Sequence, residues 1–198
     1  MAGGAPFTAL QILFVNLVMD GPPTMSLGLD PVGEYAMQRP PRSPRERIMN
    51  GSRLARILLS SAVMAAGTLA VLTWTPAPAA ATMGFVTFVF FQTFNLFNVR
   101  HDTRGAFHRE MFANRWVLIA TTAVVLLLVV LVQWNPVHGL LATTDLTAMQ
   151  WAVCALTGSV VLALGELVKL VSRGVGGRSQ DVPAPGDRWP VPNVEAVR

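Results

Sequence analysis

Two oxygen-bearing side chains lie four residues apart in an otherwise apolar stretch near the start of the chain. Asn16 supplies a carboxamide and Asp20 a carboxylate, and residues i and i+4 of a helix share one face. An ionisable group inside a membrane helix is costly and by default marks an ion or proton path. Because residues 7–29 contain no Lys or Arg to neutralise Asp20, this pair predicts a site for a hard cation with oxygen ligands.

The same stretch is interrupted directly after Asp20 by Gly21-Pro22-Pro23. Two prolines remove two amide donors, which predicts a kink or an unwound turn and leaves backbone carbonyls without helical partners. Transporters often use such broken helices to bring carbonyl oxygens to a cation. The alternative is structural, with Asp20 holding amides at the break. One Asp, one Asn and a few carbonyls are too few ligands for calcium or magnesium, so others must come from elsewhere.

The composition indicates an all-α integral membrane protein. Hydrophobic residues make up 52% of the 198 residues, charged residues 13%, and the mean hydropathy is +0.47. Apolar blocks of about 19 to 23 residues suffice to cross ~30 Å of hydrocarbon as helices. We expect a bundle of five transmembrane helices, the first broken at Gly-Pro-Pro, with spans near residues 7–29, 57–75, 81–99, 116–134 and 147–168. This membrane domain covers residues 1–173, and the Gly- and Pro-rich residues 174–198 predict a disordered tail.

The basic residues occupy only the segments that follow spans one, three and five. The connections from Thr75 to Gly84 and from Gln133 to Thr147 contain no Lys or Arg. The positive-inside rule therefore predicts an external N-terminus and a cytoplasmic C-terminus, in a plasma or inner membrane. The net charge of +4 is spread over these segments, so we expect membrane lipid and no nucleic acid as a partner.

Other polar side chains offer weaker candidates. Gln92, in the third span, is either a group near the ion path or an interhelical hydrogen-bonding residue. Cys154, the only cysteine, predicts apolar packing, and Glu166 with Lys169 predicts a surface or snorkelled ion pair. A single lysine excludes a phosphate-binding loop in these residues, and no Ser/His/Asp or Cys/His set is present, so no catalytic residue is predicted.

Five stretches carry a family pattern, and the resemblance that they indicate covers, in order, nearly all of residues 7 to 172. They are Asn16-Leu-Val-Met-Asp20-Gly, Met37-Gln-Arg-Pro-Pro-Arg-Ser-Pro-Arg-Glu46, Phe88-Val-Phe-Phe-Gln-Thr-Phe-Asn-Leu-Phe-Asn98-Val-Arg100, Phe107 to Asn114, and Gln150-Trp151 with Gly165-Glu166-Leu167. Together they resemble the C-terminal membrane half of a P-type cation-transporting ATPase of the calcium-pump group. The resemblance implies that the five spans are the sixth to tenth transmembrane helices of such a pump.

The resemblance also implies roles for individual residues. Asn16 and Asp20 match calcium ligands of the family, which a glutamate on the fourth helix completes. Met19 stands where the sarcoplasmic-reticulum type has threonine, and the plasma-membrane type resembles this chain in having Met there. Gln92 stands where the sarcoplasmic-reticulum type has a liganding glutamate. These matches favour the plasma-membrane or secretory-pathway pattern with one cation per cycle. The implied transported ion is Ca²⁺, with Mn²⁺ as an alternative.

The chain departs from the family in what it does not contain. The phosphorylated Asp in its Asp-Lys-Thr-Gly setting, the nucleotide and actuator domains and the first five helices are all missing, so ATP and Mg²⁺ would act only through those missing parts. We expect a fragment, a split-gene half whose partner is the N-terminal half of the pump, or a pump remnant. One alternative is a non-catalytic stand-alone membrane protein that docks on intact pumps or has no activity. Another is a small secondary carrier or channel that uses Asp20 as a proton-linked site.

Overall fold

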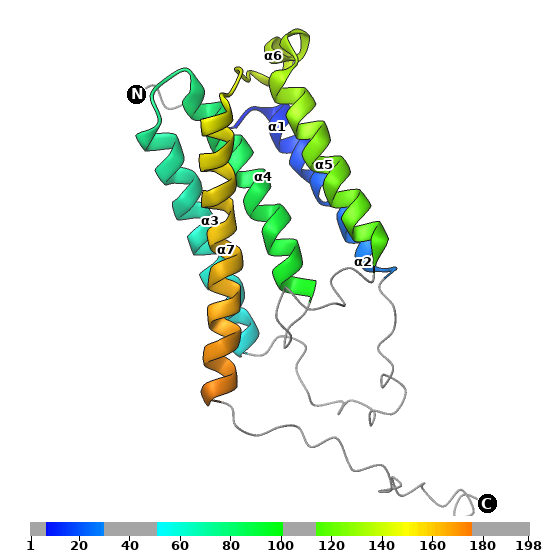
Figure 1. The fold of residues 1–198 in the computed structure, drawn as a ribbon, viewed down its shortest axis with the longest axis vertical. Helices are drawn as coiled ribbons and strands as arrows, with labels where there is room; N and C mark the ends of the chain where they lie inside the picture. The colour runs from blue at the N-terminus through cyan, green and yellow to red at the C-terminus, as the bar shows by residue number, and fades with distance from the viewer. Residues whose placement is uncertain (1–6, 30–50, 101–113, 176–198) are drawn as a thin grey trace, which may run out of the picture.

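The computed structural model describes residues 7–29, 51–100 and 114–175, and each regular element within these ranges is a helix (Figure 1). The predicted all-α class is confirmed for these residues. Four of the helices are long and apolar enough to cross a membrane, with candidate spans Arg53–Trp74, Ala79–Val99, Arg115–Gln133 and Ala148–Val171. The chain is therefore an integral membrane protein.

The first segment forms three short helices in place of one helix of membrane-spanning length. They are α1 (Ala9–Phe14), the π-helical turn η1 (Val15–Met19) and α2 (Gly21–Leu27). α1 begins with a capping box, in which the Thr8 hydroxyl accepts the Gln11 N–H and the Gln11 side chain accepts the Thr8 N–H. This segment is not among the four helices that qualify as spans, so the predicted count of five transmembrane helices is not confirmed.

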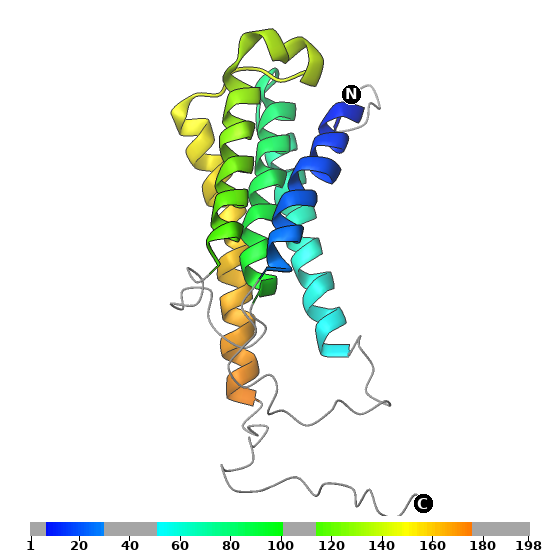
Figure 2. The ribbon, with the colours of Figure 1, turned by 90° about the vertical axis from the view of Figure 1, so that its right-hand side faces the viewer.

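The central helix of the bundle is α4. The remaining helices are α3 (Gly51–Trp74), α4 (Ala79–Arg100), α5 (Arg115–Gln133), α6 (Asn135–Leu141) and α7 (Ala148–Val175). α3 and α7 pack against α4 and against each other, while η1 and α5 also contact α4, and α2 lies along α5 (Figures 1 and 2). The first segment is thus held by α4 and α5 on the side away from α3.

Glycines let α3 and α7 approach α4 closely. A Cβ placed on Gly67 of α3 would lie 2.5 Å from the ring of Phe91, and one placed on Gly158 of α7 would lie 2.6 Å from the Cβ of Phe90. Small residues of this kind are typical of membrane helix interfaces, where close van der Waals packing drives association. The absence of a side chain at Gly67 thus allows α3 to pack closely against α4.

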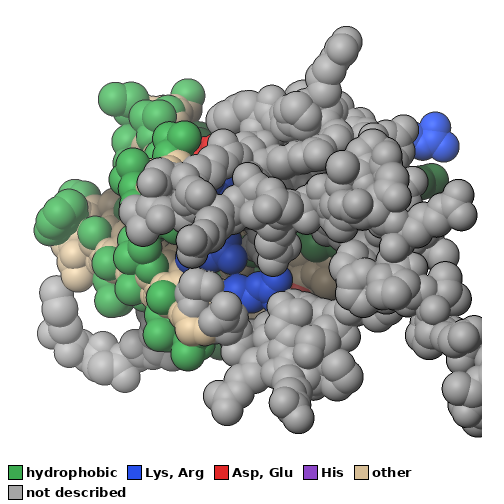
Figure 3. Space-filling view, turned by 90° about the horizontal axis from the view of Figure 1, so that it is seen from below, with side chains coloured by type: hydrophobic (Ala, Val, Ile, Leu, Met, Phe, Trp, Pro, Cys, Tyr) green, Lys and Arg blue, Asp and Glu red, His purple; other side chains and the backbone are tan. Residues whose placement is uncertain are grey.

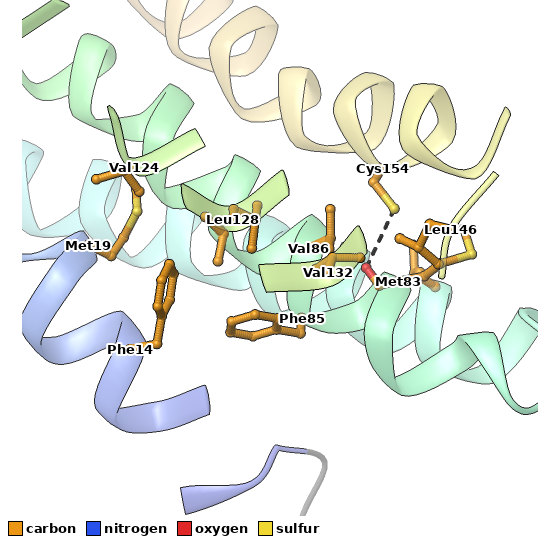
Figure 4. Packing of buried hydrophobic residues seen from close by; sticks show 12 residues of the cluster. Phe14, Met19, Met83, Phe85, Val86, Val124, Leu128, Val132, Leu146 and Cys154 are labelled. Atoms are coloured by element: carbon orange, nitrogen blue, oxygen red, sulfur yellow. Dashed lines mark hydrogen bonds between the residues drawn. The ribbon is translucent and has the colours of Figure 1, made fainter. Parts of the chain in front are cut away.

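An apolar cluster joins the first segment to α4 and α5 (Figure 4). The ring centroids of Phe14 and Phe85 lie 5.7 Å apart in an edge-to-face arrangement, and Met19 and Leu128 belong to the same buried cluster. Cys154 of α7 is fully buried in it, with its Sγ 3.6 Å from the carbonyl oxygen of Met83. The prediction that Cys154 is a packing residue is confirmed.

The predicted span boundaries agree best with the helix ends where polar residues directly flank an apolar block. Residues 81–99 and 116–134 match α4 and α5 to within two residues. α3 begins before its predicted span and α7 continues beyond its own, because helices extend past the hydrocarbon through Arg and Lys, which are good helix formers. α6 was not predicted and lies within the supposed connection from Gln133 to Thr147. The prediction that the disordered tail begins at residue 174 is wrong for residues 174 and 175, which belong to α7. The rest of that tail and the arginine-rich connection of residues 30–50 lie outside the described residues.

Candidate cation site at the pi-helical turn

The irregular turn of the first segment lies just before the two prolines. The Asp20 N–H donates to the carbonyl oxygen of Val15 at 3.0 Å, five residues back instead of four. Pro22 and Pro23 occupy the first turn of α2, where a missing N–H is tolerated. The predicted break at Gly-Pro-Pro is therefore not confirmed at those residues, and the widened turn precedes them. Single π-helical turns inside α-helices are frequent at functional sites.

The prolines nevertheless leave backbone acceptors beside the two polar side chains. In a regular α-helix the N–H groups of residues 22 and 23 would donate to the carbonyl oxygens of Val18 and Met19. Proline has no N–H, so these two oxygens have no α-helical donor. Carbonyl, carboxamide and carboxylate oxygens thus occur together within residues 16–20, and these are the ligand types that hard cations prefer.

The turn has one buried and one open side. Phe14 and Met19 are only 7% and 4% exposed and point into the apolar cluster (Figure 4). Asn16 and Asp20 are both exposed, and the neighbouring Leu17 is 66% exposed. The structure therefore leaves both predicted ligands exposed on the open side of the first segment.

Gln92 lies on the part of α4 that faces the first segment. The side chain of its neighbour Thr93 donates to the Met19 Sδ at 3.9 Å, and Phe88, one turn earlier, has its ring centroid 5.7 Å from that of Phe7. Gln92 itself is half-buried. Within the part of the chain that the structure describes, no hydrogen bond joins Gln92 to Asn16 or Asp20, so its role as a ligand stays a prediction.

Two buried amide side chains that sequence reasoning did not single out hold the ends of the first segment. Gln11 Nε2 donates to the carbonyl oxygen of Leu141 in α6 at 2.9 Å. Asn114 Nδ2 donates to the carbonyl oxygen of Ser26 in α2 at 2.8 Å. These two residues could have been found in the sequence by their positions at helix starts, because Gln11 completes a capping box and Asn114 caps α5.

Within the described residues the oxygen set is incomplete for a divalent cation. No group of three or more His, Cys, Asp or Glu side chains in this part of the chain could hold a metal ion. Calcium takes six to eight oxygen ligands and magnesium an octahedron. The open side of η1 can therefore supply part of a coordination shell.

The described residues thus form a bundle of helices long and apolar enough to span a membrane, and a π-helical turn in the first segment lies beside Asn16 and Asp20. The family model described as the C-terminus of cation-transporting ATPases matches residues 4–171. The chain belongs to this family, as the resemblance of its motifs indicated.

Relatives of the chain are calcium-transporting ATPases by name. Calcium-transporting ATPase type 2C member 2 of Rattus norvegicus is 37% identical over 175 residues, covering 85% of this chain and 18% of the relative. Type 2C member 1 of Homo sapiens is 32% identical over 175 residues, covering 85% of this chain and 19% of the relative. Calcium-transporting ATPase 1 of Saccharomyces cerevisiae is 36% identical over 116 residues, which cover 56% of this chain and 12% of the relative. The chain thus spans less than a fifth of the length of these relatives.

Proposed function

We propose that this chain supplies part of the cation site of an ATP-driven calcium pump, with Asn16 and Asp20 as ligands. The observation that carries the proposal is the exposure of both side chains on one side of η1, whose opposite side is anchored in the bundle core. A carboxylate on an uncovered apolar helix in a membrane is costly. A cation, together with further protein that covers this side, removes that cost.

The remaining ligands come from the part of the pump that this chain does not span. The carbonyl oxygens of Val18 and Met19 add to the two side chains, and the family resemblance implies a glutamate on the fourth helix of the intact pump. Gln92 lies on the adjacent part of α4. As a neutral amide it would contribute less to the binding of a cation than a carboxylate would. The open side of η1 is then the surface on which the N-terminal half of the pump packs.

Calcium is the ion that the names of the relatives support, and manganese accepts similar oxygen ligands. ATP and Mg²⁺ act through domains outside this chain. The distribution of arginines supports a cytoplasmic side for the C-terminal end of α7 and an external side for the N-terminus.

Transport by an assembled pump tests the proposal. Residues 7–171 are grafted in place of the matching segment of a type 2C calcium-transporting ATPase, and ATP-dependent calcium uptake into vesicles is measured. We expect Asn16→Ala to raise the calcium concentration for half-maximal uptake about tenfold, and Gln92→Ala to raise it less, because neutral oxygen ligands each contribute modestly.

The matched control is Asn135→Ala, which removes an exposed asparagine at the start of α6. This control should leave calcium uptake unchanged. Equal calcium dependence for Asn16→Ala and Asn135→Ala would contradict a ligand role for Asn16. A graft that is membrane-inserted and full-length but takes up no calcium would instead favour a stand-alone, non-catalytic membrane protein.

A further inference from the structure

The connection between α5 and α7, residues 134–147, is fixed to the end of α5 by side-chain hydrogen bonds. We call this connection, which includes α6, the α6 loop. His138 Nε2 donates to the carbonyl oxygen of Val132 at 2.7 Å. Gln133 Nε2 donates to the carbonyl oxygen of Leu146 at 3.0 Å, and the Leu146 N–H donates to Gln133 Oε1 at 3.2 Å. Three hydrogen bonds therefore hold the α6 loop against α5.

The α6 loop is also attached to α4, the central helix of the bundle. The Thr144 N–H donates to the Oγ1 of Thr82 at 2.9 Å, and Thr82 is fully buried. Leu141 and Leu146 are only 5% and 4% exposed, so the inner side of the loop is covered by the bundle. The α6 loop is thus held in place by two of the transmembrane helices.

The first segment is attached to the α6 loop through Gln11. Gln11 Nε2 donates to the carbonyl oxygen of Leu141 at 2.9 Å, which joins α1 to α6, and Gln11 Oε1 accepts the Thr8 N–H at 2.9 Å. Gln11 is only 1% exposed. Removing a buried donor leaves its acceptor without that partner, which costs more than the net value of a hydrogen bond. Gln11 therefore fixes the start of the first segment against the α6 loop.

This attachment lies close in sequence to the predicted cation ligands. Gln11 precedes Asn16 by five residues, and η1 lies between Gln11 and Asp20. Adjacent residues of a helix differ in direction by about 100°, so a shift of the π-helical turn by one residue would rotate the side chains that follow it by that angle. Attachment at Gln11 limits such a shift, because it holds the helix on one side of the turn.

The α6 loop lies at the end of the bundle opposite the basic side chains. α6 is at the top of Figure 1, and the view from below shows Lys and Arg side chains near the middle of the molecule (Figure 3). Residues 134–147 contain no Lys or Arg. The positive-inside rule thus supports an external position for the α6 loop and for its contact with Gln11.

We propose that Gln11 is a positioning residue for the cation site, which it orients by fixing α1 to the α6 loop. The inference rests on the proposed function, since it requires Asn16 and Asp20 to be cation ligands. The two ends of the Gln11 amide are engaged by Thr8 and Leu141, so Gln11 acts through the backbone of the first segment and not as a ligand. Without Gln11 only a fraction of the molecules hold their ligands in the binding orientation, which lowers the apparent affinity for calcium. Saturating calcium selects that orientation, so the maximal rate is kept.

Calcium uptake by the grafted pump tests the proposal. Gln11→Met keeps the length of the side chain and removes its amide. We expect it to raise the calcium concentration for half-maximal uptake about fivefold and to change maximal uptake less than about twofold. The matched control is Gln150→Met, because Gln150 forms the same reciprocal cap with Thr147 at the start of α7. The control should leave the calcium dependence unchanged.

The two kinetic parameters separate positioning from a loss of folded protein. Lower maximal uptake of Gln11→Met at an unchanged half-maximal calcium concentration would overturn the proposal, as would equal effects of Gln11→Met and Gln150→Met. Asn16→Ala separates this proposal from the proposed function. A normal calcium dependence of Gln11→Met beside a shifted one for Asn16→Ala overturns the positioning role alone. A normal calcium dependence of Asn16→Ala contradicts the ligand role on which both depend.

Hydrogen exchange in the purified full chain tests the attachment without transport. We expect the amides of residues 9–19 to exchange at least about fivefold faster in Gln11→Met than in Gln150→Met, with α7 unchanged in Gln11→Met. His138→Phe keeps a ring but removes the donor to the Val132 carbonyl, and it should also speed exchange in residues 9–19 because the α6 loop is loosened. Unchanged exchange of residues 9–19 in Gln11→Met overturns the proposal, whatever the grafted pump does.

Discussion

Asn114 joins α2 to α5 through both ends of its amide. Its Nδ2 donates to the carbonyl oxygen of Ser26 at 2.8 Å, and its Oδ1 accepts the Trp116 N–H at 2.9 Å as the cap of α5. The side chain is 3% exposed. One buried residue thus fixes the end of the segment that carries Asp20 to the start of the neighbouring transmembrane helix.

Loss of the Asn114 amide should destabilise the bundle. We expect Asn114→Ala to lower the free energy of unfolding by about 2 kcal/mol, since both a helix cap and a buried hydrogen bond are lost. Asn114→Ser should recover about half of this, because serine caps helices but lacks the amide donor. Titration with a denaturing detergent, followed by circular dichroism, measures both. Asn135→Ala, at an exposed asparagine, is the control, and an equal effect in the control would contradict the role of Asn114.

The contact between Gly67 and Phe91 predicts a strong dependence on side-chain size. Gly67→Ala places a Cβ 2.5 Å from the Phe91 ring and should destabilise the α3–α4 interface by about 1 to 3 kcal/mol. Gly139→Ala meets nothing within 4 Å and should be neutral or slightly stabilising. Thermal unfolding in detergent compares the two. Similar melting temperatures for both variants would show that α3 does not pack against α4 as closely as described.

Glu166 and Lys169 form the predicted ion pair at 3.2 Å, but Lys169 is only 5% exposed and so lies inside the bundle rather than at the surface. This pair predicts coupling between two substitutions. Removing only the carboxylate with Glu166→Gln leaves a buried cation with one fewer acidic partner and should cost about 1 to 2 kcal/mol. The double variant Glu166→Gln/Lys169→Met should lose less than the sum of the two single variants, with a coupling of about 1 kcal/mol. Additive effects in the unfolding titration would mean that the ion pair contributes nothing.

Much of the fold could be predicted from the sequence because membrane spans follow from hydropathy. The ends of α4 and α5 agree closely with prediction, since polar residues flank their apolar blocks. The widened turn η1 could not be predicted. In this turn each hydrogen bond spans five residues, and Phe14 and Met19 on either side of it are both buried against α4 and α5. This packing has no local sequence signature.

The sequence indicated the candidate residues Asn16 and Asp20, whose role as ligands stays a prediction, but it did not indicate their surroundings. The spacing of Asn16 and Asp20 indicated one shared face, and the structure places both on one side. Hydrophobic periodicity could not show that this side would be open, because apolar residues occur on every face of an apolar helix. The hydrogen bond from Gln11 to Leu141 joins residues that are 130 positions apart, so it too could not be predicted.

The most direct test of the account is the calcium dependence of phosphorylation by ATP in the grafted pump. Asp20→Asn removes the only carboxylate of η1 and its flanking residues. We expect the calcium requirement to rise about a hundredfold or more, because the charged ligand is lost from a desolvated site. Asp145→Asn, at an exposed carboxylate between α6 and α7, should leave it unchanged. The same calcium dependence in both variants would contradict the assignment of Asp20 as a cation ligand.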